Sequence, residues 1–229
     1  MDENNYEKML TLFNAENYST HKIDPQKIVQ MRKEMMSMQH LYSAAIREIS
    51  SKLKTLDEEF QILHSHNPIQ HIESRLKSSD SIGEKLVRRG FPLTSQSVRD
   101  NITDIAGVRV VCHYIDDIYT IADLISKQSD IKVIRMSDYI KEPKPNGYRS
   151  LHIIATVPVY LSTKVEHIPV EIQIRTIAMD FWASLEHSLK YKSSDEVSET
   201  LRVRIKNCAE SIAQLDCEMQ EIHKVIRGV

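Results

Sequence analysis

The chain is poor in cysteine and has no long apolar run. Its 229 residues include three cysteines, an odd number with no Cys-x-x-Cys spacing, which argues against a disulfide framework or a zinc knuckle. No apolar stretch approaches the ~20 residues that a membrane-spanning helix needs, and the acidic, polar N-terminus lacks the charged-then-apolar layout of a signal peptide. We therefore expect a cytoplasmic protein without a membrane partner.

A large charge excess is also missing. The 30 Lys and Arg residues against 32 Asp and Glu residues give a formal net charge of -2, whereas proteins that coat nucleic acid usually carry a strong basic excess. We expect no DNA partner, while RNA binding stays open. Positive charge concentrates instead between Arg75 and Arg109. His64, His66 and His71 keep a metal site in question, although the chain has no His-Glu-x-x-His or His-Asp motif.

Apolar spacing divides the chain into three parts. A length of 229 residues with 41% hydrophobic content fits a single domain with a buried core. Apolar steps of three and four predict a long helix from Asp24–Pro25, its N-cap and first turn, to Leu63, and a second from Leu201 to Ile226. We predict a single domain over 1–229, with a helical region at 1–67, a catalytic-size core at 68–192 and a C-terminal helix at 193–229. The two helices are expected to pack on each other and on a sheet, with oligomer formation by the rest of their apolar seams as the alternative.

The start of the core carries a run of cations. On a strand, Arg75 and Lys77 share one face, and Ser81 with Glu84 forms a capping-box pattern that predicts a helix start. The basic side chains that follow at helical spacing are Lys85, Arg88 and Arg89. Cations near a helix N-terminus and beside a basic strand suit a polyphosphate ligand, although a solvated basic helix face is an equal alternative.

An isolated acid precedes the next strand. Val108 and Val110 read as the inward face of a buried strand, with Arg109 on the other side and Asp104 just before it. A lone Asp there is usually a turn or cap residue, yet a polyphosphate site needs a hard carboxylate for Mg2+. Asp116 and Asp117 compete for that role, and we interpret them as caps of a helix over 118–125.

A Pro- and Gly-containing turn presents an aromatic ring. In the segment 143–148, two prolines and a glycine predict a rigid turn that displays Tyr148, and a strand continues from Leu151. Packing against a neighbour would explain this ring, but Lys144 and Arg149 on either side favour stacking on a nucleotide base.

The strand that follows has one apolar and one polar face. Val170, Ile172 and Ile174 alternate with the polar side chains Glu171, Gln173 and Arg175. An ordinary half-buried strand with a solvated face is the commoner explanation of this pattern. The neighbouring Gly-Tyr turn favours a functional face that presents an acid, an amide and a guanidinium in a row.

Five motifs over residues 72–192 stand in the order seen in RelA/SpoT-type (p)ppGpp synthetases, which this chain therefore resembles. They are Arg-Leu-Lys with Ser-Ile-Gly-Glu-Lys, Asp-Ile-Ala-Gly-Val-Arg, Pro-Lys-Pro-Asn-Gly-Tyr-Arg-Ser-Leu-His, Glu-Ile-Gln-Ile-Arg-Thr and Asp-Phe-Trp-Ala-Ser-Leu-Glu-His. The resemblance implies a small, stand-alone alarmone synthetase with a nucleotidyltransferase-like core. It implies transfer of the β,γ-pyrophosphate of ATP to the 3'-hydroxyl of GDP or GTP, with release of AMP.

The resemblance also implies roles for individual residues. Arg75 and Arg109 would sandwich adenine, and the ATP phosphates would be held by Lys77, Ser81, Lys85 and Arg88. Asp104 would carry Mg2+, and Glu171 would act as general base on the 3'-hydroxyl or orient it and help to hold the metal, with support from Gln173. The GDP or GTP site would use Tyr148 as a stacking ring together with Lys144, Asn146, His152, Arg175 and Asp180.

Asp180 departs from the family pattern, because some relatives carry Asn at this position. Its carboxylate would either read the guanine N1-H and N2-H groups or cap a helix starting at Phe181, and the sequence leaves both open.

The strand patterns predict an α/β (α+β) fold with a mixed β-sheet and long flanking N- and C-terminal helices. Strands are expected near 72–77, 107–113, 131–136, 151–157 and 168–175, and the resemblance implies a homotetramer held by the flanking helices. A nucleotidyl transferase would share this core, but its usual Gly-Ser helix start and Asp-x-Asp pair are absent from the sequence. A non-catalytic nucleotide- or RNA-binding regulator would keep the cations and lose the acids Asp104 and Glu171.

Overall fold

The computed structural model describes residues 25–192 and 198–228. Within them, the chain forms β1 (Ile69–Leu76), β2 (Ala106–Cys112), β3 (Lys132–Asp138), β4 (Leu151–Tyr160) and β5 (Val165–Thr176). The helices are α2 (Pro25–Leu63), α3 (Ser79–Arg88), α4 (Ser95–Asn101), α5 (Ile115–Ser126), α6 (Ile177–Lys192) and α7 (Glu199–Arg227). Each predicted strand is present within a few residues of its expected bounds. The predicted N-cap Asp24 lies outside the described residues.

The five strands form one mixed sheet in the order β1-β2-β5-β4-β3. β2 and β5 are parallel, whereas the pairs β1–β2, β5–β4 and β4–β3 are antiparallel. The predicted α+β fold with a mixed sheet is therefore confirmed. Because β5 lies between β2 and β4, side chains from the first and last thirds of the core become neighbours across the sheet.

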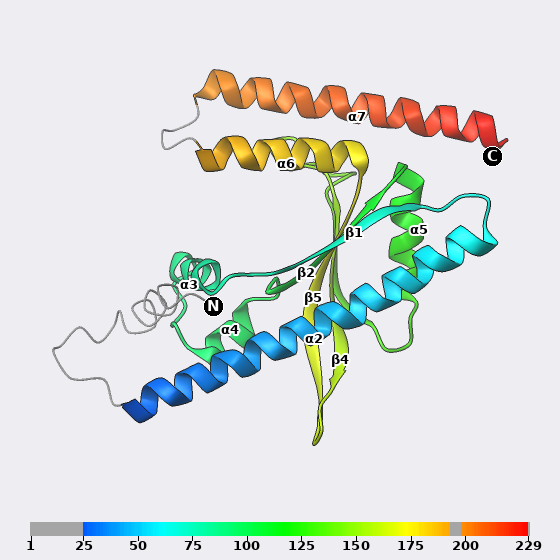
Figure 1. Ribbon diagram of the computed structural model, residues 1–229. Coiled ribbons are helices and arrows are strands. Elements are labelled where there is room, and N and C mark those ends of the chain that lie inside the picture. Colours follow the sequence, from blue (N-terminus) through cyan, green and yellow to red (C-terminus); the bar gives the residue numbers. More distant parts are fainter. Residues whose placement is uncertain (1–24, 193–197, 229) are drawn as a thin grey trace.

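One face of the sheet holds the core. Alternate residues of the central strands, such as Val108, Ile172 and Ile153, are fully or almost fully buried and cluster with Ile49 of α2 and Ile121 of α5. The long helix α2 runs across this face, as Figure 1 shows. Burying the apolar stripe of α2 there leaves the opposite face of the sheet for polar side chains.

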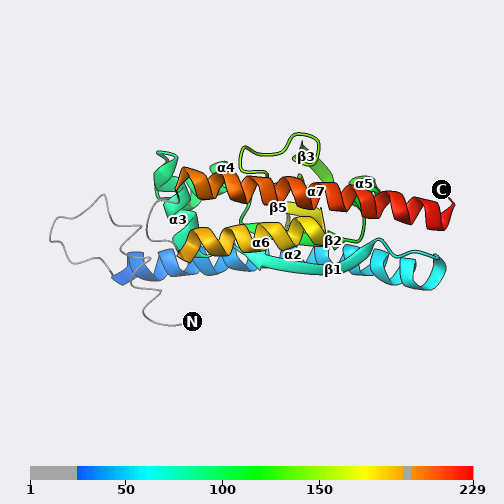
Figure 2. The same cartoon turned by 90° about the horizontal axis from the view of Figure 1, so that it is seen from above.

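The long helices do not pack on each other as expected. α2 lies on the sheet, whereas α7 lies beside α6 in both Figure 1 and Figure 2, and this pair stands at the top of the molecule in Figure 1. Contact between the C-terminal end of α7 and the chain after α2 includes hydrogen bonds from the Arg227 guanidinium to the Ser65 hydroxyl and carbonyl oxygens, at 3.0 and 2.8 Å. The sequence pattern shows which stripe of a helix is apolar but not which partner covers it.

Two helices, α3 and α5, also begin earlier than predicted. The N-cap of α3 is Ser78, whose hydroxyl accepts from the Ser81 backbone N-H, so the expected start at Ser81 is wrong. α5 begins at Ile115, which places Asp116 and Asp117 in its first turn, where the Asp117 carboxylate accepts from the Tyr114 N-H. Short polar residues near a helix start are easily assigned to the wrong position of the first turn.

Candidate active site

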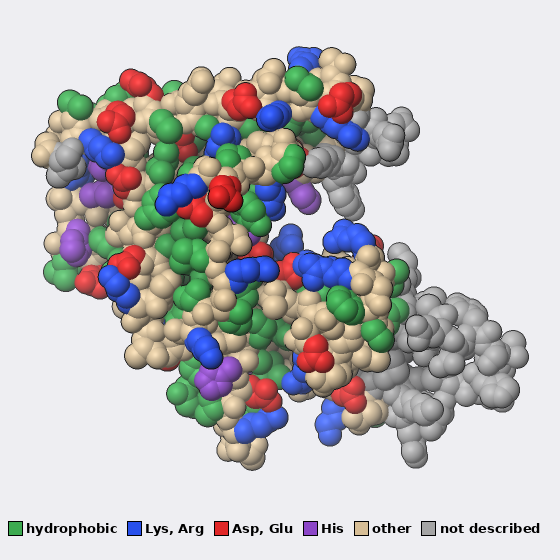
Figure 3. All heavy atoms as spheres, turned by 180° about the vertical axis from the view of Figure 1, so that it is seen from behind, with side chains coloured by type: hydrophobic (Ala, Val, Ile, Leu, Met, Phe, Trp, Pro, Cys, Tyr) green, Lys and Arg blue, Asp and Glu red, His purple; other side chains and the backbone are tan. Residues whose placement is uncertain are grey.

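The pairing of β1, β2 and β5 brings polar side chains together on one face of the sheet. β5 presents Glu171, Gln173 and Arg175, and the first two stand opposite Gly107 and Arg109 of β2. On the other side of β2, Arg75 of β1 pairs with Gly107. Figure 3 shows Lys and Arg side chains gathered around an indentation on this side of the molecule, between the end that carries α6 and α7 and the end that carries α3.

Asp104 is the centre of a charged cluster in the loop before β2. The Nζ atoms of Lys77, after β1, and Lys85, on α3, each lie 2.7 Å from its Oδ2 atom. Burial alone would raise the pKa of Asp104, but the hydrogen bonds and charges of the two lysines outweigh it and lower the pKa to about 2. Its buried Oδ1 atom has no hydrogen-bond partner among the described residues. Asp104 is therefore ionised at neutral pH, and both lysines bind the same one of its two oxygens.

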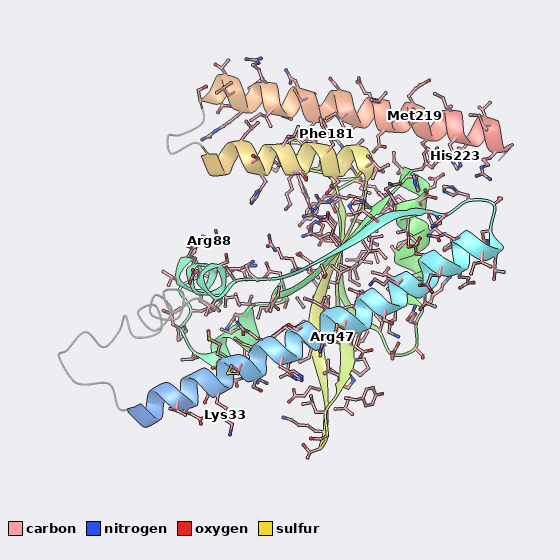
Figure 4. All side chains as sticks on the ribbon, viewed as in Figure 1. Lys33, Arg47, Arg88, Phe181, Met219 and His223 are labelled. Carbon is pink, nitrogen blue, oxygen red and sulfur yellow. The ribbon has the colours of Figure 1, made fainter. Side chains whose placement is uncertain are left out.

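Other residues predicted to bind ATP lie on α3 and β1. Ser81 lies in the first turn of α3, where its hydroxyl accepts from the Ser78 hydroxyl at 2.9 Å. Arg88 is exposed on the last turn of α3 (Figure 4), and Arg75 is exposed on β1. Their side chains are therefore accessible from solvent on the basic side of the site.

Arg109 is held from two sides. Its Nη1 atom lies 3.2 Å from Glu73 of β1 and 3.4 Å from Asp180 of α6. Asp180 also receives a hydrogen bond from Arg175 at 3.2 Å. α6 starts at Ile177, so Asp180 does not cap a helix at Phe181, and that alternative is wrong. The Thr176 hydroxyl serves that first turn instead, because it accepts from the Met179 N-H.

Glu171 and four neighbouring side chains close a ring of hydrogen bonds. Arg175 Nη2 donates to the Tyr148 hydroxyl at 3.0 Å and to Gln173 Oε1 at 2.7 Å. Gln173 Nε2 donates to Glu171 Oε2 at 2.9 Å. His152 Nδ1 lies 3.3 Å from Glu171 Oε1, and its Nε2 atom lies 2.8 Å from the Tyr148 hydroxyl.

The electrostatics of Glu171 connect this ring to the lysine cluster. Burial raises the pKa of Glu171, but the hydrogen bonds with His152 and Gln173 lower it below its usual value overall. The negative charge of Asp104 acts in the opposite direction. The two carboxylates therefore lie close enough to sense each other, at the boundary between the two groups of residues.

The loop 142–150 presents Tyr148 through a tight turn. Gly147 has a φ of +90°, and its backbone N-H donates to the Lys144 carbonyl at 2.8 Å. Asn146 Oδ1 accepts from the Tyr148 N-H at 3.2 Å, and Asn146 Nδ2 donates to Glu186 of α6 at 3.0 Å. Asn146 thus fixes the loop to α6.

α7 also holds this loop in place. A Cβ built on Gly147 would lie 2.5 Å from the Cβ of Ala209, which shows how closely the loop approaches α7. Arg149 Nη1 donates to the Ala209 carbonyl at 3.3 Å. The position of Tyr148 therefore depends on a helix that lies far from it in sequence.

Sequence reasoning missed one aromatic residue. The rings of Tyr139 and His152 are nearly perpendicular, with their centroids 5.1 Å apart. The Lys144 ammonium lies 4.5 Å from the centre of the Tyr139 ring and 4.7 Å from that of Tyr148. Tyr139 follows β3 with no turn or motif signal around it. The antiparallel pairing of β3 with β4 is what brings it to the loop.

The histidines considered for a metal site have other neighbours. His66 Nε2 lies 2.9 Å from Asp117, and His71 lies 3.4 Å from Glu73. Within the part of the chain that the structure describes, no group of three or more His, Cys, Asp or Glu side chains is arranged to hold a metal ion. The same residues include no helix long and apolar enough to cross a membrane.

The mixed sheet, the lysine-bound carboxylate and the ring around Glu171 place acids and cations of the kind used by phosphoryl-transfer enzymes on one polar face. Comparison with known proteins places the chain more closely. The family model described as "Region found in RelA / SpoT proteins" matches residues 74–196. The chain belongs to the RelA/SpoT family.

Relatives and solved structures agree with this assignment. The chain is 44% identical to the GTP pyrophosphokinase YwaC of Bacillus subtilis over 81% of this chain and 89% of that protein. It is 38% identical to the GTP pyrophosphokinase YjbM of the same organism, over 79% of this chain and 84% of the relative. The crystal structure of small alarmone synthetase 1 from Bacillus subtilis with its product pppGpp matches with a TM-score of 0.79 and 36% identity, covering 85% of this chain and 98% of that one.

Proposed function

We propose that this chain is a GTP pyrophosphokinase that makes (p)ppGpp, the alarmone of the stringent response, in the cytoplasm. It transfers the β,γ-pyrophosphate of ATP to the ribose 3'-hydroxyl of GDP or GTP and releases AMP. The observation that carries this proposal is the meeting of the lysine-bound Asp104 with the hydrogen-bonded Glu171 on one sheet face. The similarity to two proteins named GTP pyrophosphokinase over most of the chain supports it.

The donor half lies on β1, α3 and the loop before β2. Lys77 and Lys85 are already gathered at one carboxylate, and they would exchange part of that contact for the phosphates of ATP. Ser81 and Arg88 extend the same cradle along α3. The guanidinium groups of Arg75 and Arg109 stand on neighbouring strands, from which they would stack on the two faces of adenine. A related structure contains the ATP analogue AMPCPP.

Asp104 and Glu171 are the residues that would hold Mg2+. The fit rests on the buried Oδ1 atom of Asp104, which lacks a hydrogen-bond partner in the described chain, and on the hard oxygen ligands that Mg2+ prefers. When bound, the ion would neutralise charge on the transferred pyrophosphate. Two protein carboxylates suffice because Mg2+ usually keeps waters and substrate phosphates as its other ligands.

The acceptor half lies on β4, β5 and the loop that carries Tyr148. The Tyr148 ring would stack on guanine, while Lys144 and His152 lie near the expected position of the acceptor phosphates. Asn146 contributes through the shape of the loop, and Arg175 supports the Tyr148 hydroxyl. With the capping role of Asp180 removed, its carboxylate, placed by Arg175 and Arg109, is proposed to accept from guanine N1-H and N2-H.

In the reaction, the 3'-oxygen attacks the β-phosphorus of ATP and the bond between that phosphorus and the α-phosphate oxygen breaks, so AMP leaves. Glu171 is ionised at neutral pH because its pKa is lowered, and it accepts the hydrogen bond of the 3'-hydroxyl and then its proton. Gln173 keeps the carboxylate in place. Most of the acceleration comes from positioning and charge neutralisation, because this type of transfer asks little covalent chemistry of the protein.

We also propose a homotetramer that uses the α6–α7 end of the molecule. Apolar side chains stand open to solvent on both helices, including Phe181 with 57% and Met219 with 46% of their surface exposed (Figure 4). Leu185, Leu215 and Ile222 continue this surface. An exposed apolar surface of this kind is typical of a protein interface.

Incubation of the protein with ATP, Mg2+ and either GDP or GTP tests the activity. We expect equimolar AMP and a guanosine 3'-pyrophosphate, resolved by anion-exchange chromatography. A Glu171→Gln variant should make neither product while it retains ATP binding. Absence of product from the unmodified protein across a range of salt and metal concentrations would exclude the enzyme and favour a non-catalytic nucleotide-binding regulator.

A further inference from the structure

We propose that the Tyr148 hydroxyl and His152 together orient the Glu171 carboxylate, so that Tyr148 serves the guanine with its ring and the reaction with its hydroxyl. The inference rests on the roles proposed above for Tyr148 and Glu171. His152 then acts as a positioning residue for Glu171, a role distinct from contact with the acceptor phosphates.

The chemistry of the donors sets the direction of the hydrogen bonds. A guanidinium can only donate, so the Tyr148 oxygen accepts from Arg175 and its own hydrogen is left to point elsewhere. The atom within reach is His152 Nε2, at 2.8 Å. A neutral His152 that accepts at Nε2 carries its hydrogen on Nδ1, which faces Glu171 Oε1 at 3.3 Å. This tautomer is inferred from the network.

The second route runs through Gln173. Its Oε1 atom accepts from Arg175 at 2.7 Å, which turns its amide nitrogen toward Glu171 Oε2 at 2.9 Å. Both routes begin at Arg175 and end on different oxygens of the same carboxylate. These two contacts fix both the position of the Glu171 carboxylate and the orientation of its plane. The orientation matters because a base must present a lone pair to the reacting proton.

Only one member of this ring comes from a loop. Glu171, Gln173 and Arg175 are on β5 and His152 is on β4, and Arg175 is only 3% exposed. Tyr148 belongs to the loop 142–150. The route through His152 therefore closes only while this loop is seated, and guanine that stacks on the Tyr148 ring would stabilise the seated loop. Acceptor binding and the alignment of Glu171 are linked in this way.

Tyr148→Phe separates the two roles, because the ring is kept and the hydroxyl is lost. We expect kcat to fall about 5- to 10-fold, the rate equivalent of one lost hydrogen bond, while KM for GDP or GTP and KM for ATP stay within about twofold of the unmodified protein. Tyr148→Ala should lower kcat and also raise KM for the guanine nucleotide, because stacking is lost as well.

His152 variants test the other end of the link. His152→Ala should lower kcat about as much as Tyr148→Phe, and combining the two should cost little more than either alone, because both break the same route. His152→Asn should recover part of kcat, since its amide nitrogen can replace Nδ1 as a donor to Glu171. Tyr160→Phe, at the exposed far end of β4, serves as the matched control and should leave kcat and KM unchanged.

Circular dichroism and thermal unfolding establish that each variant is folded. Unchanged kcat in Tyr148→Phe would overturn the proposal, and so would multiplicative losses in the double variant. A His152→Ala variant that raises KM for GDP or GTP with kcat unchanged would assign His152 to phosphate contact alone. In each of these outcomes the unmodified protein still makes product, which distinguishes them from failure of the proposed pyrophosphokinase activity.

Discussion

Gly147→Ala should raise KM for GDP or GTP selectively by displacing the loop that carries Tyr148. Gly147 has a φ of +90°, a conformation that costs an L-residue about 1–2 kcal/mol. The new methyl group would also stand 2.5 Å from the Ala209 Cβ, a separation that forces the loop or α7 to move. The backbone cost alone corresponds to an increase of up to about 5- to 30-fold in KM, if the seated loop is the form that binds guanine. KM for ATP should change far less, because the residues assigned to ATP lie on other elements, β1, α3, β2 and the loop before β2.

A second substitution divides this effect into two parts. Ala209→Gly removes the atom that the new methyl group would meet, at a cost of about 1 kcal/mol in helix stability. The double variant Gly147→Ala/Ala209→Gly should recover the steric part of the loss in guanine KM and retain the backbone part. Gly228→Ala is the control, because Gly228 has a similar φ of +73° with nothing within 4 Å of its would-be Cβ.

Steady-state kinetics with each substrate varied in turn measure both KM values, and urea unfolding measures stability. Equal increases in KM for ATP and for the guanine nucleotide in Gly147→Ala would refute the reasoning. So would a wild-type guanine KM in that variant, or a double variant with no recovery. Gly228→Ala is expected to lose stability with both KM values unchanged.

Three further predictions concern other parts of the molecule. Asp104→Asn should lower kcat roughly 100-fold or more, the scale of losing a preorganised electrostatic contact, while calorimetric ATP binding persists; near-normal turnover would contradict the role of Asp104. Leu215→Glu, at a position 59% exposed on α7, should shift the oligomer to smaller species in light scattering with circular dichroism unchanged; an unmodified protein that is already monomeric would contradict the proposed assembly. Burial raises the pKa of Asp216 above 3.8, and the Thr176 hydroxyl only partly offsets this. The stability that Asp216 contributes is therefore present below about pH 4 and is lost as pH rises through its folded-state pKa. As pH rises from about 4 to 7, the free energy of unfolding of Asp216→Asn in urea should therefore increase relative to that of the unmodified protein. A pH-independent difference would contradict this.

Alternation within single strands made much of the polar face predictable. Glu171, Gln173 and Arg175 share one side of β5 because strand geometry alone requires it, and the same holds for the apolar side that joins the core. The sequence predicted that Lys77 and Lys85 belong to a basic site for a polyphosphate, but it did not predict that both lysines pair with Asp104. That the acid itself pairs with both lysines depends on the loop before β2, which no periodic pattern describes.

The remaining features depend on contacts between distant segments. The position of Tyr139, the approach of Ala209 to Gly147 and the ion pairs of Asp180 are set by the sheet order and by the docking of α7, and neither leaves a local signal in the sequence. The apolar stripes of α2 and α7 were recognised from the sequence, but the prediction that the two helices pack on each other was wrong. An apolar stripe shows that a helix face must be covered, and it does not show which element covers it.

The sheet order β1-β2-β5-β4-β3 contains a single parallel pairing, between β2 and β5. The residues assigned to the donor lie on one side of this boundary, from Arg75 to Arg109, and those assigned to the acceptor lie on the other, from Lys144 to Asp180. The residues assigned to each substrate thus come from one continuous segment of the chain. The pyrophosphate would be transferred at the boundary between the two segments, where β2 pairs with β5. We therefore expect acceptor preference to be exchangeable between family members as a single contiguous segment that keeps Glu171, with the ATP-binding residues from Arg75 to Arg109 left in place.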